Sequence, residues 1–86
     1  MKINWQICNH LPNGINGYIQ ESNIMLTVYK CNVDGQYVEM VWIAGKSEIY
    51  SKSSHSCCIA AMVHAEAAAS NLLDEIAAKS AVWQEV

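Results

Sequence analysis

The chain has 86 residues, of which 52% are hydrophobic and 15% charged, and its net charge is −3 at pH 7. This length allows one small domain, and the composition is that of a folded chain, not a disordered one. The five cationic residues are dispersed lysines and arginine is absent, so the chain lacks the clustered cations that contact nucleic-acid phosphates. We therefore expect no direct binding to DNA or RNA.

The first ten residues, MKINWQICNH, lack the apolar segment of a secretory signal peptide. No run approaches the ~18 apolar residues of a membrane-spanning helix. We expect a cytoplasmic protein with no membrane partner, and we expect its four cysteines to be reduced thiols.

The first strand is predicted at residues 2–8, where apolar Ile3, Trp5 and Ile7 alternate with polar residues. Residues 9–17 contain the only proline and two glycines, which predicts a loop. A short second strand is expected at residues 18–22, ending in a tight turn.

Residues 24–31 are β-branched and aromatic, which predicts a third strand. The dipeptide Asp34-Gly35 favours a hairpin turn into a fourth strand at residues 36–44. A short fifth strand is expected at 48–52. The order predicts an antiparallel meander of four or five strands within residues 2–51.

One long helix is predicted over residues 56–84, because the chain from Cys57 onward lacks glycine and proline and is rich in alanine. Ser54 or Ser56 is expected to cap its first turn. Apolar residues recur at spacings of three and four at Cys58, Met62, Ala65, Ala69, Leu72 and Ile76, and the stripe resumes at Trp83 after Lys79. A meander followed by one helix on one sheet face predicts an α+β single domain spanning residues 1–86.

Glu39 determines which face of the fourth strand is expected to meet the helix. If this carboxylate faces solvent, its neighbours on either side must face inward. The residues expected inward are Ile24, Leu26, Val28, Val38, Met40 and Trp42. Those expected on the outer face with Glu39 are Met25, Thr27, Tyr29, Tyr37, Val41 and Ile43. Tyrosine and methionine beside polar residues are typical of a binding interface; coverage of this face by the 9–17 loop is the alternative.

Histidines and cysteines supply the candidate chemical sites. The possible zinc ligands are Cys8, His10, Cys31, His55, Cys57, Cys58 and His64. They are not spaced as the paired knuckles of structural zinc sites, and adjacent helical residues point about 100° apart. We therefore predict no metal and no cofactor, with a small Cys/His metal-binding domain as an alternative.

Cys57 is also a candidate nucleophile, because a thiol in the first helical turn is activated by the helix dipole. His55 could serve as its base. No oxyanion loop or third catalytic group accompanies the pair, so we predict that the protein is not an enzyme.

Four segments, INW, GYIQ, LTVYKCNVDGQYVEMVWIAG and AAMVHAEAAASNLLDEIA, together resemble a pattern found in small phage and prophage proteins. These proteins run a tryptophan strand, further strands with an Asp-Gly hairpin and a tryptophan strand, then an alanine-rich helix. Some are anti-CRISPR or other counter-defence inhibitors, which block a host effector sterically. The resemblance implies a non-enzymatic inhibitor in the bacterial cytoplasm that binds a host protein complex.

The expected contact residues lie on the outer sheet face, at the helix start and on the helix flank. They are Met25, Tyr29, Tyr37, Glu39, Val41, His55, Cys57, His64, Asn71 and Glu75. A homodimer, paired through the helix or the outer sheet face, is the alternative interaction module.

Overall fold

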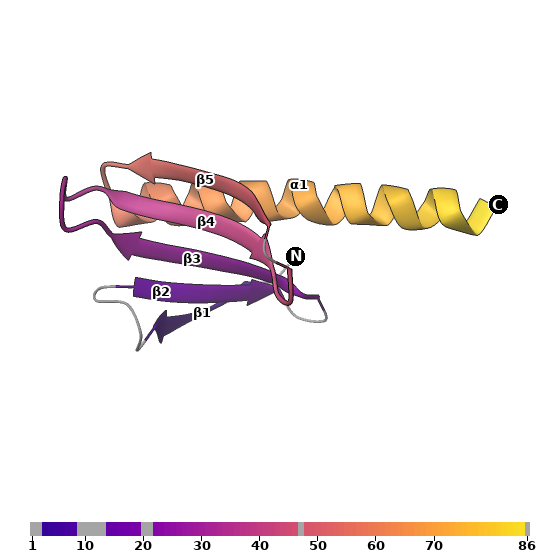
Figure 1. Ribbon diagram of the computed structural model, residues 1–86, viewed down its shortest axis with the longest axis horizontal. Helices are drawn as coiled ribbons and strands as arrows, with labels where there is room; N and C mark the ends of the chain where they lie inside the picture. Colours follow the sequence, from indigo (N-terminus) through magenta and orange to yellow (C-terminus); the bar gives the residue numbers. More distant parts are fainter. Residues whose placement is uncertain (1–2, 9–13, 20–21, 47, 86) are drawn as a thin grey trace.

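The computed structural model describes residues 3–8, 14–19, 22–46 and 48–85. Its elements, in chain order, are β1 (Ile3–Cys8), β2 (Gly14–Ile19), β3 (Ile24–Lys30), β4 (Tyr37–Ile43), β5 (Ile49–His55) and α1 (Cys58–Glu85). The strands form one antiparallel sheet in the order β1-β2-β3-β4-β5, and α1 packs on its β3–β5 side (Figure 1). The predicted α+β meander with one C-terminal helix is confirmed.

Two strands, β2 and β5, differ from their predicted bounds by more than one residue. Residues Gly14 to Gly17, expected in a loop, belong to β2, where Gly17 lies opposite both Trp5 and Leu26. The last strand continues to His55, beyond the expected end at residue 52. The rest of the expected loop, residues 9–13, lies outside the described residues.

The turn between β3 and β4 follows the predicted Asp-Gly signal. Gly35 has φ 71°, a conformation that glycine adopts without steric cost. The Asp34 carboxylate accepts a hydrogen bond from the Gln36 amide at 2.9 Å.

The helix begins with a cysteine cap in place of the predicted serine cap. The Cys57 Sγ atom accepts from the Ala60 amide at 3.4 Å, and the Cys57 carbonyl accepts from Ala61 at 3.2 Å. Ser54 belongs to β5, so its hydroxyl is not placed at the helix start.

The predicted orientation of β4 is wrong. Register pairs Val28 with Glu39 and Leu26 with Val41, so Glu39 and Val41 share the helix-facing side with the buried residues of β3. Both are 0% exposed. Met40 and Trp42, expected inward, instead share the opposite face with Thr27 and Met25. The prediction rests on the usual preference of a carboxylate for solvent, whereas the Glu39 carboxylate is buried and accepts hydrogen bonds from Ser53 and His64.

The helix packs on the sheet through small side chains. Ala61, Ala65 and Ala69 are fully buried and Leu72 is nearly so, which allows the helix backbone to approach the strands closely. Ile76, expected in the same stripe, is 41% exposed. The C-terminal part of α1 extends beyond the end of the sheet (Figure 1).

Trp5 covers the part of the sheet beside the helix. A Cβ atom on Gly17 would lie 2.9 Å from the Trp5 ring, so the indole requires a glycine beneath it. The indole Nε1–H donates to the Glu66 carboxylate of α1 at 3.0 Å. The first strand is thereby joined to the helix by a side-chain hydrogen bond.

Candidate functional site

The predicted sheet contacts separate onto two faces. Met25 and Tyr29 lie half-buried on the face that α1 does not cover, as expected. Glu39 and Val41 lie beneath the helix with no exposed surface, so they cannot contact a partner. Tyr37 is half-buried on that same face, opposite His55.

The predicted contacts near the helix also divide. His55 and His64 lie together, with ring centroids 4.9 Å apart. Cys57, Asn71 and Glu75 are exposed at separate points of the chain. The Glu75 carboxylate accepts a hydrogen bond from the Tyr50 hydroxyl at 3.1 Å, so it already has a partner within the fold.

We call the uncovered side of the sheet the open face. Register places on it the side chains of Asn4, Gln6, Asn16, Tyr18, Met25, Thr27, Tyr29, Val38, Met40, Trp42, Lys52 and Ser54. Among the described residues, no helix or strand packs against this face. Its centre is aromatic and aliphatic, and its margins are polar.

Hydrogen bonds hold several open-face side chains in place. Trp42 Nε1–H donates to the Thr27 hydroxyl at 3.3 Å, and that hydroxyl donates to the Asn16 amide oxygen at 3.0 Å. Tyr18 donates to Gln6 at 2.7 Å. Thr27 is only 5% exposed, so larger neighbours shield it although no described element lies above. The open face is therefore an ordered surface with fixed aromatic groups.

A second feature lies beneath the start of the helix, and we call it the carboxylate cluster. It consists of Glu39 from β4, Ser53 and His55 from β5, and His64 from α1. Glu39 Oε1 accepts from the Ser53 hydroxyl at 2.5 Å and from His64 Nδ1 at 2.8 Å. Ser51 adds a longer contact to the same oxygen at 3.4 Å.

The other carboxylate oxygen, Glu39 Oε2, is buried, and no donor among the described residues reaches it. An unpartnered buried polar atom is uncommon in folded proteins and costs about 1–3 kcal/mol. Half of the His64 side chain is exposed. The cluster therefore extends from a fully buried carboxylate to the solvent.

The hydrogen-bond pattern assigns roles in the cluster. Ser53 has one hydroxyl proton, and the short contact to Glu39 uses it. His55 Nε2, 3.0 Å from the same hydroxyl, must then donate to it. The serine is therefore held by a carboxylate and is not activated by a base, as a nucleophile would be.

The cluster also contains nitrogen and oxygen atoms of the kind that bind metals. One ligand atom from each of Glu39, His55 and His64 lies within 4.8 Å of the others. This is the only such group of three found among the described residues. Neither Cys57 nor Cys58 belongs to it, and His10 and the side chain of Cys8 lie outside what the structure describes.

Sequence reasoning identified both histidines and Glu39, but it placed Glu39 on the outer face instead of beside the histidines, and it missed Ser53. A signal was present in β5, where Ser51, Ser53 and His55 occupy alternate positions and therefore one face of the strand. A polar stripe facing a helix requires a polar partner beneath that helix. Glu39 is the residue that satisfies this requirement.

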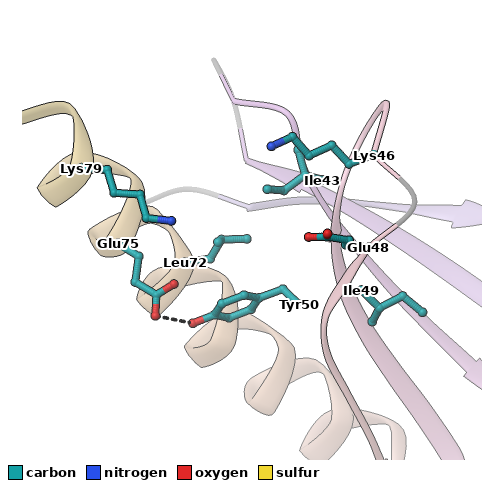
Figure 2. Close-up of a pocket in the computed structure, with 8 residues that line it drawn as sticks. All are labelled: Ile43, Lys46, Glu48, Ile49, Tyr50, Leu72, Glu75 and Lys79. Atoms are coloured by element: carbon teal, nitrogen blue, oxygen red, sulfur yellow. Dashed lines mark hydrogen bonds between the residues drawn. The ribbon is translucent and has the colours of Figure 1, made fainter. Parts of the chain in front are cut away.

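A pocket opens at the far end of the β4–β5 hairpin. Its volume is 340 Å³, and its walls include Lys46 and Glu48 of the hairpin and Glu75 and Lys79 of the helix (Figure 2). Desolvation raises the pKa of Tyr50, and the hydrogen bond and negative charge of Glu75 raise it further. The formal charges of the two lysines and two glutamates that line the pocket balance.

Comparisons with known proteins found no matching family, no similar curated protein and no similar solved structure. The expected relation to phage proteins and counter-defence inhibitors stays a prediction. No helix within the described chain is both long and apolar enough to cross a membrane.

Proposed function

We propose that this protein is an interaction module that pairs with a second copy of itself through the open face. The observation that supports this proposal is an aromatic and aliphatic sheet surface against which no described element packs. Contiguous apolar patches are small on monomeric proteins, and larger ones mark contact sites. The central side chains are Met25, Tyr29, Met40 and Trp42, all half-buried.

The charge distribution favours a second copy as the occupant. Among the residues that the structure describes, Lys52 is the only charged one that register places on the open face, at its β5 margin. The described carboxylates lie in turns, on α1 or beneath it. Two copies of a nearly neutral face meet without like-charge repulsion, although each whole chain is acidic.

The size of the face also suits a dimer. Five strands of six or seven residues make a surface of about 500 Å² in projection. Side-chain relief increases the accessible area above this value, to the order of the ~800 Å² per partner of a standard interface. A two-fold axis lying in the plane between the two open faces would oppose Met40 and Trp42 of one copy to the same region of the other.

Sedimentation of the full chain over a concentration series to tens of micromolar tests the proposal. The wild type is expected to show a monomer–dimer equilibrium. Met40→Glu, which places a carboxylate in both halves of the contact, is expected to weaken dimerisation at least about 30-fold. Ile59→Glu is the matched control, since Ile59 is 74% exposed on the helix; it should leave the dimer intact.

A wild-type protein that stays monomeric overturns the proposal, as does a dimer that Ile59→Glu disrupts and Met40→Glu does not. Circular dichroism checks that the Met40→Glu monomer is folded. Met40→Gln supplies a milder variant if it is not, with a smaller expected loss of affinity in the same direction.

A further inference from the structure

The carboxylate cluster has the donor set and the spacing of a metal site. We propose that Glu39, His55 and His64 bind a divalent first-row transition-metal ion of the zinc class, with Ser53 at the fourth corner. This site lies on the helix side of the sheet, and the inference does not depend on pairing through the open face.

The distances support a four-coordinate arrangement. Zinc binds nitrogen and oxygen at about 2.0–2.2 Å, which separates neighbouring donor atoms by about 3.3 Å in a tetrahedron. Ser53 Oγ lies 2.5 Å from Glu39 Oε1, 3.0 Å from His55 Nε2 and 3.4 Å from His64 Nδ1. The three ligand atoms lie within 4.8 Å of one another. Their separations therefore exceed the tetrahedral value by about 1.5 Å at most, and small side-chain movements would bring the three atoms onto one ion.

The buried carboxylate supplies the reason for a cation. Glu39 is 0% exposed and its Oε2 atom has no donor among the described residues. A buried carboxylate with one oxygen left without a hydrogen bond carries a free-energy cost, and a cation bound to that carboxylate offsets the cost. His64, 49% exposed in its side chain, places one ligand at the surface and gives an ion access from solvent.

Proton positions change without net reaction when the ion binds. Before binding, His64 Nδ1–H donates to Glu39 and His55 Nε2–H donates to Ser53, as the hydrogen-bond pattern requires. Metal ligation needs the lone pairs of these same nitrogens. Each neutral imidazole therefore carries its proton on the other ring nitrogen in the bound form, and the Ser53 hydroxyl reorients. No electron is transferred.

The donor types select the class of ion. Two imidazoles and one carboxylate suit zinc, cobalt and iron(II), whereas soft Cu(I) requires sulfur and calcium or magnesium prefer all-oxygen sites. Zn²⁺ is therefore the ligand for calorimetry, and Co²⁺ is a spectroscopic probe whose visible bands report four-coordination.

Titration of the full chain with Zn²⁺ and Co²⁺ tests the site. His64→Ala and His55→Ala are each expected to weaken binding at least about 100-fold, and Glu39→Gln similarly. Cys57→Ser is the control for binding by an exposed thiol and should bind as tightly as the wild type. Ser53→Cys places a thiolate at the fourth corner; it should tighten binding and add a sulfur-to-cobalt charge-transfer band.

Two results overturn the proposal: a wild type that binds neither ion at hundreds of micromolar, or binding lost in Cys57→Ser and retained in the histidine variants. Circular dichroism of each variant without metal separates loss of ligand from loss of fold. Nitrogen-15 NMR of the imidazoles gives an independent measurement, because zinc must shift His55 Nε2 and His64 Nδ1 and leave His10 unchanged.

Discussion

The two faces of the sheet differ in what covers them and in the residues that they present. The helix side is closed by alanines and leucine and contains one fully buried carboxylate with its polar partners. The open face has aromatic side chains and, among the described residues, no carboxylate. Its central residues Met25, Tyr29, Met40 and Trp42 are half-buried, and Thr27 and Val38 between them are buried. Beneath the helix, therefore, even a carboxylate is fully buried, whereas the large apolar side chains at the centre of the open face keep part of their surface exposed. Glu39 beneath the helix has hydrogen bonds to one carboxylate oxygen, Oε1, whereas Oε2 has no donor among the described residues.

The largest contrast should appear between neighbouring residues of β3. Leu26→Ala is expected to lower the free energy of unfolding by about 2–5 kcal/mol, because Leu26 is fully buried and a cavity remains. Met25→Ala, on the open face, should cost about 1 kcal/mol or less in the monomer. Chemical denaturation at low protein concentration measures both. Equal losses would show that the open face is covered in the monomer.

The close packing of α1 on the sheet predicts that its buried and exposed alanines differ in their tolerance of larger side chains. Ala65→Leu should destabilise the protein by about 1–3 kcal/mol, because the added atoms enter a fully packed contact. Ala67→Leu, at an exposed position of the same helix, is the control and should change stability by less than about 0.5 kcal/mol. Thermal unfolding compares the pair, and an unchanged Ala65→Leu melting temperature would contradict the packing described.

Trp5 lies on the helix side of the sheet and Trp42 on the open face, so the same tryptophan-to-phenylalanine substitution can be compared on both faces. Trp5→Phe removes a hydrogen bond to the Glu66 carboxylate, and Trp42→Phe removes one to the Thr27 hydroxyl. We expect losses of about 1–2 kcal/mol for Trp5 and about 0.5–1.5 kcal/mol for Trp42, since bonds to charged acceptors are stronger. Urea unfolding measures both, and the reverse order would show that the open-face network matters more.

The smallest effect concerns the edge between sheet and helix. The raised pKa of Tyr50 means that the folded protein favours the neutral phenol. Its contribution to stability is present below the ordinary tyrosine pKa of 10.0 and is lost as the pH rises through the higher folded value. Glu75→Gln removes the negative charge and should lower the pKa of Tyr50 toward 10.0. Ultraviolet titration, taken as the difference from Tyr50→Phe, measures this shift; no change would show that desolvation alone raises it.

The sequence was sufficient for the strand order and for the helix. Alternation in β1, β-branched residues in β3 and the Asp34-Gly35 turn are local signals, and each predicts its element without knowledge of the rest. The orientation of β4 is not a local property. Glu39 is flanked by apolar residues on both faces, so the pattern is consistent with either side, and only the partners settle the choice.

Those partners are distant in the chain. Ser53 and His64 lie 14 and 25 residues beyond Glu39, on two other elements. Their approach to Glu39 depends on the rotation of α1 and on the β4–β5 register. That register includes an irregularity at Val41–Trp42. The sequence pattern indicates cysteines and histidines as possible metal ligands, whereas the proximity of the Glu39 carboxylate to the histidines is visible only in the folded structure.

The meander order also has a consequence for how the chain folds. Each described strand pairs with the strand next to it in sequence, so every hairpin closes a short loop and none must await a distant segment. The helix then joins the sheet last in chain order, through side chains that add little bulk. We expect fast folding with a transition state in which β3 and β4 are paired. Variants in the helix contact, such as Ala65→Leu, should then accelerate unfolding more than they slow folding.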